Sequence, residues 1–390
     1  MTRARSPRRG ASLASLTLAL GLLAPAALRA QSSQFGFRGV GIPTRGLSVR
    51  SMGTGGSFSI FDPQSSLNPA ALGPLDFTSA SFTALQEYRS TSNPFGSSSV
   101  RETRFPQVTL SGPIKHLPVV LGASYSAYSN RDFSIVSSDT AVLRGIPVPV
   151  NDTLDSRGGL SSARVAGAYR LGEHTSVGIA FHLITGSDRV VQRRDFTDTT
   201  YLPVSERSEL SYSGVGASIG LVQQIGPRML LALAARSDGH VNIDKDSARV
   251  GRLDLPYTFS GGVRYRFGRR LDLAAQGVYQ TWSGANSDLG GTDNPPGFNT
   301  MELSFGGEYT PDPRRPSRRP IRFGVRYGTL PFPIVPGAQP HELGLSLGTG
   351  ARFAKDRAGV DVSLEHVSRS DGTGRSERAW LIGLGVTIRP

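Results

Sequence analysis

The sequence predicts an all-β fold, a transmembrane antiparallel β-barrel of about 14 strands. Three observations predict it: an export signal at the amino terminus, strand-like segments that return about every 25 residues, and connections that alternate between short and long. The pattern is clearest from Trp380 to Ile388, where large apolar side chains occupy the even positions and Leu, Gly, Gly and Thr the odd ones. Alternate side chains of a strand lie on opposite faces, so this segment has one apolar face.

An export signal precedes the strands. Four arginines lie before the apolar run from Leu13 to Leu23, and small residues follow up to Ala30. The run is shorter than the roughly 20 residues that a membrane-spanning helix needs, so we expect residues 1–30 to be a cleaved secretory signal peptide. Cleavage after Ala26 is the alternative. Removing residues 1–30 takes away five arginines and no acidic residue, which lowers the formal charge from +13 to +8.

The composition of the full sequence fits a barrel and excludes several other classes. The chain has no cysteine, which excludes disulfides, thiolate metal sites and a cysteine nucleophile. Its hydrophobic content is 38% and its mean hydropathy is −0.19, as expected when only alternate strand positions face lipid. We therefore expect residues 77–390 to form a barrel in the outer membrane of a Gram-negative-type envelope.

The expected strands form an ordered series of hairpins. Their number is even, which places both ends of the barrel on one side of the membrane. Short turns follow the even-numbered strands and long loops follow the odd-numbered ones, as in barrels with periplasmic turns and extracellular loops. The expected strands are 77–88, 105–115, 117–128, 157–170, 174–185, 208–224, 227–236, 254–267, 269–281, 300–310, 319–328, 341–353, 357–367 and 379–389. The expected long loops are 89–104, 129–156, 186–207, 237–253, 282–299, 329–340 and 368–378.

Alternation also assigns the faces of the strands. In residues 257–267 the odd positions are mostly aromatic or apolar, and the even positions are polar, glycine or arginine. An arginine on the lipid face near the midplane costs about 2–4 kcal/mol, so the register that turns the charges inward is preferred over one slipped by a residue. These charges form either a selectivity lining or headgroup site, or, in the interpretation that we prefer, a structural ion-pair network. The candidate lumen residues are Arg264, Arg266, Glu302, Glu308, Arg322, Arg326, Asp361 and Glu365.

Aromatic residues near the ends of the expected strands suit the interfacial girdles of a membrane barrel. We expect Tyr128, Tyr212 and Trp282 among them.

Residues 31–76 do not alternate and are rich in turn-forming residues. Asn68 can cap a turn through its side chain, Pro69 suits the first position of a short helix, and glycines allow close approach to a barrel wall. An ordinary compact turn before the first strand is the alternative interpretation. The motif residues are Gly53, Gly55, Gly56, Asp62, Asn68, Pro69 and Ala70.

These residues carry a resemblance to a known family. The runs Arg50-Ser51-Met52-Gly53-Thr54-Gly55-Gly56-Ser57, Phe61-Asp62-Pro63 and Ser66-Leu67-Asn68-Pro69-Ala70-Ala71-Leu72 resemble the amino-terminal motif of the FadL-type (OMPP1/FadL/TodX) outer-membrane transporters of hydrophobic compounds. The resemblance covers about residues 36–76 and is architectural along the barrel. Two departures are Ala71, where the family usually has glycine, and an ending of Ile388-Arg389-Pro390 in place of a terminal aromatic residue.

The resemblance implies that residues 31–76 form a hatch in the lumen of a barrel of about 14 strands. It also implies passive uptake of long-chain fatty acids or other hydrophobic small molecules, which leave through a lateral opening into the membrane, without nucleotide, cofactor or catalysis. The alternative is a non-transporting FadL-like barrel that acts as an assembly or docking partner for secreted or envelope proteins. A porin for polar solutes is disfavoured by the expected hatch.

One extracellular loop is the preferred ligand contact. The segment 330–336 alternates apolar residues with prolines, so a stiff apolar loop is expected there, either lining a capture groove or packing on itself over the barrel mouth. The candidate ligand residues are Leu330, Phe332, Ile334 and Val335.

Enzyme and nucleic-acid patterns are missing from the sequence. The six histidines are scattered without metal-ligand spacing, and no Gly-x-Ser-x-Gly elbow occurs. The arginines of the expected turn 311–320 lack interleaved aromatic residues, which disfavours nucleic acid as a partner. We expect neither an enzyme nor a bound metal, and outer-membrane lipid as the surrounding partner.

Overall fold

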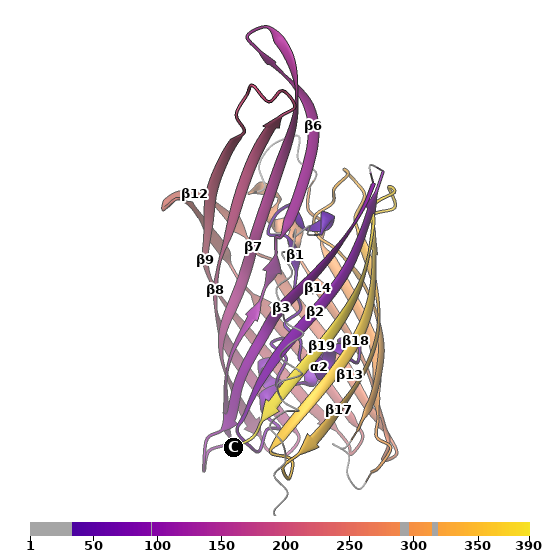
Figure 1. Ribbon diagram of the computed structural model, residues 1–390. Coiled ribbons are helices and arrows are strands. Elements are labelled where there is room, and N and C mark those ends of the chain that lie inside the picture. The colour runs from indigo at the N-terminus through magenta and orange to yellow at the C-terminus, as the bar shows by residue number, and fades with distance from the viewer. Residues whose placement is uncertain (1–32, 95, 289–295, 314–318) are drawn as a thin grey trace, which may run out of the picture.

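The computed structural model describes residues 33–94, 96–288, 296–313 and 319–390, and the expected signal peptide lies outside these ranges. The described chain is a closed antiparallel β-barrel (Figure 1). Over the described ranges, no helix is both long enough and apolar enough to cross a bilayer.

The barrel wall contains 14 strand positions, as predicted, and each expected strand has its counterpart in the same order. Three positions are interrupted. β4 and β6 both pair with β7, and β10 and β11 both pair with β9. β12 and β13 also share one position, because β12 pairs with β11 and β13 pairs with β10. The wall strands are β2 (Ser79–Asn93), β3 (Gly96–Pro113), β4 (Val119–Ala127), β6 (Phe133–Leu143), β7 (Ile146–Leu171), β8 (Thr175–Phe196), β9 (Val204–Ile225), β10 (Met229–Ser237), β11 (His240–Lys245), β12 (Ala248–Asp254), β13 (Tyr257–Phe267), β14 (Leu271–Gln280), β15 (Thr300–Tyr309), β16 (Ile321–Thr329), β17 (His341–Phe353), β18 (Ala358–Ser370) and β19 (Ser376–Ile388).

Several expected long loops are in fact extended hairpins. β7 has 26 residues and β8 and β9 have 22 each, whereas about 9–11 tilted residues suffice to span a bilayer. β6 to β9 therefore rise far above the other strands (Figure 1). The predicted loops 129–156 and 186–207 were wrong in this respect, because a strand above the membrane has no lipid-facing side and loses the alternation that marks a strand in the sequence.

The strand faces follow the predicted alternation. Tyr257 of β13 is 57% exposed on the lipid face, whereas its neighbour Thr258 is 7% exposed on the luminal side. Three aromatic residues expected in the girdles are not in them: Trp282 and Tyr212 are buried in an apolar cluster, and Tyr128 packs against it. The prediction was wrong because the side chain of Tyr212 alternates to the luminal face of β9, as that of Ser218 does, and Trp282 lies beyond the end of β14.

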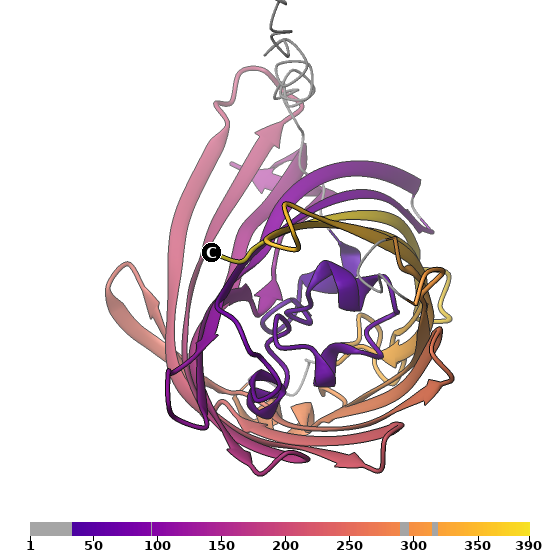
Figure 2. The same cartoon turned by 90° about the horizontal axis from the view of Figure 1, so that it is seen from below.

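Residues 33–76, which we call the luminal segment, lie within the ring of strands when the barrel is seen from below (Figure 2). Their elements are η2 (Gln34–Gly36), β1 (Ile42–Pro43), α2 (Val49–Met52), η3 (Ser59–Phe61) and η4 (Pro69–Leu72). The segment is not a free tail, because β1 pairs with the short strand β5 (Ser129–Asn130). η4 is in contact with β7, β8 and β9.

Candidate functional site

The luminal segment is organised around the carboxylate of Asp62. Asp62 is buried and accepts hydrogen bonds from the hydroxyls of Ser48, Ser51 (2.7 Å) and Ser65 (3.3 Å) and from the backbone N–H of Gln64 (3.0 Å). Ser48 also caps α2 by accepting from the N–H of Ser51. One carboxylate thus ties the start of α2 to the turn that follows η3, which makes this irregular chain a compact unit.

Removing this carboxylate should loosen the luminal segment. Hydrogen bonds to a charged group contribute about 1.5–3 kcal/mol each, and the serine hydroxyls would be left buried without their acceptor. We expect Asp62→Ala to speed amide hydrogen exchange in residues 48–65 by at least about tenfold in mass-spectrometric measurements on the protein in nanodiscs. Asp139→Ala, at an exposed position in the middle of β6, is the matched control. Equal exchange in both variants would contradict the role of Asp62.

The motif around Asn68 docks on the wall. The side chain of Asn68 caps η4 by accepting from the N–H of Ala70 (2.9 Å), and it donates to the carbonyl of Ile60 (3.0 Å) and more weakly to that of Leu221 in β9 (3.4 Å). Pro69 occupies the first turn of η4. The cap therefore joins two parts of the luminal segment and reaches the barrel.

The motif glycines lie where backbones meet. A Cβ on Gly53 would lie 3.0 Å from the Cα of Gly348, and one on Gly55 would lie 3.0 Å from the backbone N of Val325. Gly55 also has a φ of +67°, which disfavours other residues, and Gly56 has a φ of +93°. These positions let the turn after α2 pack directly on β16 and β17, while α2 itself is in contact with β17, β18 and β19.

The predicted luminal charges form a set of ion pairs that falls into three separate groups. Arg322 bonds to Glu308 (2.7 Å) and to Asp361 (2.7 Å) in the first group, and Arg326 pairs with Glu365 (2.9 Å) in the second. Glu302 belongs to the second group, because it is 4.0 Å from Arg45, which also pairs with Glu365. Arg264 and Arg266 form the third group, since both pair with Asp272 near the short-turn rim.

Sequence reasoning missed several members of this set. Glu342 pairs with both Arg326 and Arg369, and Arg369 lies 3.4 Å from Glu377. Glu342 follows the same inward alternation as Gly344 and Ser346 of β17, so the alternation of side chains along the strand could have predicted it. Other missed members, Arg45 and Arg50, lie in the luminal segment, where no periodicity indicates which way a side chain points.

Arg50 fastens the luminal segment to this network. It forms an ion pair with Glu308 of β15 at 2.8 Å. The negative charge of Glu308 raises the pKa of Arg50 above its ordinary value, so the pair stays ionised.

A cavity of about 520 Å³ lies between the luminal segment and the barrel wall. Its apolar lining includes Leu47, Leu85, Val278, Leu330 and Leu381. Its charged lining consists of arginines and carboxylates in nearly equal number. A volume of this size and mixed character is in the range of small-molecule sites. The charged side chains of its lining are Arg45, Glu87, Arg89, Arg104, Arg236, Asp238, Glu302, Arg326, Glu342, Glu365 and Arg369.

The wall is interrupted beside this cavity. β3 pairs with β4 only over Gln107–Pro113, β5 turns inward to pair with β1, and β6 pairs with β7. Within the described part of the chain, the stretch Gly96–Pro106 of β3 therefore has no strand partner on this side. β3 and β6 diverge at this level (Figure 1).

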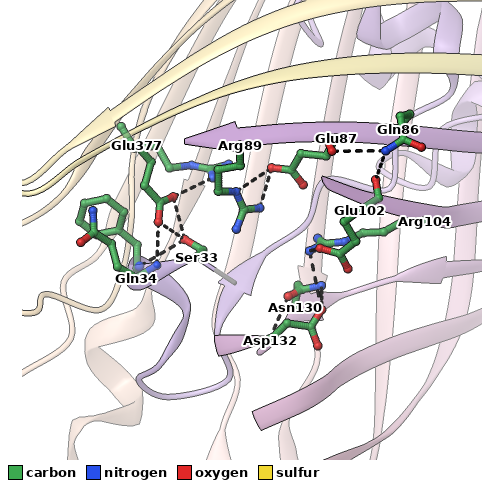
Figure 3. Close-up of polar contacts among 12 residues, drawn as sticks. Ser33, Gln34, Gln86, Glu87, Arg89, Glu102, Arg104, Asn130, Asp132 and Glu377 are labelled. Atoms are coloured by element: carbon green, nitrogen blue, oxygen red, sulfur yellow. Dashed lines mark hydrogen bonds and ion pairs between the residues drawn. The ribbon is translucent and has the colours of Figure 1, made fainter. Parts of the chain in front are cut away.

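The cavity reaches this interruption. Phe105 and Thr103 alternate outward on β3 and are exposed, yet they line the same cavity as the luminal residues. Arg104 points across the interruption to Asp132, 3.7 Å away, so a side-chain pair stands where a strand ladder would otherwise close the wall (Figure 3). The interruption is a lateral opening of the cavity in the wall.

The start of the luminal segment is hydrogen-bonded to the wall close to this interruption. The hydroxyl of Ser33 and the backbone N–H of Gln34 donate to the carboxylate of Glu377 in β19, at 2.8 and 2.7 Å (Figure 3). Arg89 and Glu87 of β2 pair with each other next to it.

The predicted ligand loop is divided between two roles. Leu330 lines the cavity, whereas Phe332 is 2% exposed and packs edge-to-face on Trp282 with ring centroids 5.3 Å apart. Ile334 and Val335 are half-buried and do not line the cavity. The loop therefore packs over the barrel mouth, and only its first residues face the cavity.

The described ranges contain no cluster of three or more potential metal-ligating side chains. His182 is buried and hydrogen-bonded to the hydroxyl of Ser218 at 2.8 Å.

Comparison with known proteins identifies the family and the fold. A family model described as BamG matches residues 13–229, more than half of the chain, and no curated protein matches it in sequence. Among solved structures, the chain is similar to a Pseudomonas aeruginosa FadL homologue, with a TM-score of 0.63 and 16% identity over 89% of this chain and 99% of that chain. The Pseudomonas putida toluene transporter TodX gives a TM-score of 0.57 and 12% identity over 89% and 98% of the two chains. The CymD monoaromatic hydrocarbon channel gives 0.54 and 15% over 88% and 98%. The protein is thus a FadL-like barrel of outer-membrane type, and it belongs to the BamG family.

Proposed function

We propose that this protein is an outer-membrane channel for passive uptake of hydrophobic small molecules, with long-chain fatty acids as the first candidates. One observation carries the proposal: a single cavity of about 520 Å³ is lined both by luminal side chains and by outward-facing residues at the interrupted wall. A ligand held there has a path toward lipid that does not cross the barrel axis. The similarity to TodX, a toluene transporter, and to CymD, a monoaromatic hydrocarbon channel, supports an apolar ligand class.

In this proposal residues 1–30 are removed on export and the luminal segment is the hatch. It blocks the straight path to the periplasmic rim, so a ligand from the barrel mouth leaves sideways past Phe105. Transfer of apolar area from water into the cavity and then into lipid supplies about 25 cal/mol per Å². The arginines and carboxylates of the cavity neutralise one another, which lowers the cost of placing an apolar molecule beside them.

Filling the cavity should reduce ligand binding. Val278 lines it, and its partners in the sheet, Ser260 and Glu302, point inward as well. We expect Val278→Trp to weaken binding of a fluorescent long-chain fatty acid to the protein in nanodiscs by about tenfold or more, because a large side chain displaces the ligand from a closely packed site. Leu303→Trp, on the lipid face of β15, is the matched control.

The result separates the possibilities. Saturable binding that is lost in Val278→Trp and kept in Leu303→Trp supports the channel. Binding that never exceeds the background of empty nanodiscs would sink the proposal.

A second candidate function is docking of an envelope or secreted protein. It is favoured by the hairpins of β6 to β9, which carry exposed apolar residues far above the lipid-facing part of the wall, including Val136, Val142 and Leu202. Shortening β6 and β7 between residues 137 and 150 should then abolish association with that partner while leaving fatty-acid binding intact. The reverse result would favour the channel alone.

A further inference from the structure

The short-turn rim of the barrel contains a second cavity, of about 490 Å³, on the opposite side of the luminal segment from the first. Short turns of such barrels are periplasmic, so this cavity faces the periplasm. Eight arginines and three carboxylates contribute to its lining. We call it the arginine vestibule.

All three carboxylates of the vestibule form ion pairs with arginines of its lining. Each of the three is shared by two arginines, so none is left to balance the remaining cations. The pairs are Arg264 and Arg266 with Asp272, Arg50 and Arg322 with Glu308, and Arg322 and Arg352 with Asp361.

Three arginines of the vestibule have no carboxylate partner among the described residues. Arg269 and Arg270 lie in the exposed turn after β13, and Arg389 lies over the ring of Phe77 at 3.9 Å. Nη1 of Arg352 and Nε of Arg389 are buried and make no hydrogen bond to any described residue. The vestibule therefore presents guanidinium donors without a partner from several elements to one cavity.

We propose that the arginine vestibule binds a compact multivalent oxyanion of the phosphate type. Guanidinium groups match phosphate oxygens with paired N–H donors, and donors that converge from different elements favour a ligand with several charged oxygens over a single chloride. The volume suits a small molecule. The proposal concerns a site separate from the upper cavity and does not depend on any ligand crossing the barrel.

The vestibule also joins the luminal segment to the wall. Arg50 belongs to α2, whereas Arg264 belongs to β13, and the two positive charges disfavour each other across the vestibule. An anion between them converts this repulsion into a bridge. Bound oxyanion therefore holds the luminal segment in place, because a ligand that binds only the docked form stabilises it.

Pyrophosphate is the probe for this site. Calorimetric titration of the mature protein in nanodiscs, at constant ionic strength, should show saturable binding of pyrophosphate. We expect Arg269→Gln combined with Arg270→Gln to weaken it at least tenfold, since each lost charge-assisted bond removes roughly that factor or more. Both side chains are exposed and outside the ion-pair network, so the fold should tolerate their loss. Arg144→Gln combined with Arg357→Gln removes the same charge from exposed positions outside the vestibule and should change the affinity less than twofold.

Hydrogen exchange tests the bridge. Pyrophosphate should slow amide exchange in residues 48–57 of the wild-type protein, and Arg50→Gln should abolish that protection. Binding without protection would overturn the bridging role. Equal loss in both double variants would reduce the site to general attraction by a basic rim. Binding of an oligo-aspartate peptide but not of pyrophosphate would reassign the vestibule to an acidic protein segment.

Discussion

Replacing Arg326 by methionine should lower the free energy of unfolding by about 3–5 kcal/mol, the range observed when one partner of a buried ion pair is removed. Arg326 is 2% exposed and contacts both Glu342 and Glu365. Methionine keeps the length and volume of the stem, so the change isolates the charge.

The size of the effect follows from the charges that remain. Without Arg326, the nearby cations are Arg45 and Arg369, and they face four carboxylates at Glu302, Glu342, Glu365 and Glu377. Uncompensated negative charge would then stay inside the barrel, away from bulk water. At lower pH some of these carboxylates become protonated, which reduces the uncompensated charge. The difference in unfolding free energy between Arg326→Met and the wild-type protein should therefore be smaller at lower pH.

Urea unfolding from lipid vesicles, followed by tryptophan fluorescence, measures this change, since the chain has two tryptophans, one luminal and one on the lipid face. Arg266→Met is the matched control, because Arg266 has a 54% exposed side chain at the rim and should cost less than about 1 kcal/mol. If Arg326→Met unfolds like the wild-type protein, the network does not hold the barrel together.

The sequence allowed the barrel to be predicted because lipid imposes a rule on every spanning strand. Polar side chains on the outer face cost free energy, so the alternation in β13 and β19 records the register directly. The same rule placed Glu308 and Arg322 inside, and the register makes them direct cross-strand partners. Above the membrane that constraint ends, which is why β6 and the upper part of β7 were expected to be loops.

The site was less predictable than the wall because its parts come from distant segments without periodicity. The motif at Asn68 identified the luminal segment, yet nothing in the sequence shows that Arg50 meets Glu308, a residue 258 positions away. The interruption of the wall was equally hidden. It arises because β5 pairs with β1 and not with a strand of the wall, and no local pattern in residues 129–130 indicates this tertiary contact.

A valine at Gly324 should displace the luminal segment from the wall. A Cβ at this position in β16 would lie 2.2 Å from the carbonyl carbon of Thr54 and 2.5 Å from the backbone N of Gly55. Both contacts are with backbone, so rotation of a side chain cannot relieve them. Gly306 of the neighbouring strand shows the same crowding, 2.3 Å from the carbonyl oxygen of Thr54. The wall has glycine on both strands because α2 and the turn after it lie directly on the sheet.

With valine at position 324, either the wall strand β16 or the luminal segment must move. The wall strand β16 is held by complete ladders to β15 and β17, whereas Thr54 and Gly55 lie in a turn. Overpacking costs about 1–3 kcal/mol or more, so the turn at Thr54 and Gly55, which is held less firmly than β16, should move. The ion pair between Arg50 and Glu308 would be lost with it.

We expect proteolysis within residues 44–62 to accelerate at least tenfold and single-channel conductance in planar bilayers to rise. Gly167→Val, on the lipid face of β7, is the matched control, because a Cβ there would lie 3.5 Å from Cδ2 of Leu121, an ordinary van der Waals contact. A barrel that stays closed to ions with valine at position 324 would mean that the luminal segment does not obstruct the lumen. In that case the lateral opening, rather than the segment, would have to account for any control of passage through the wall.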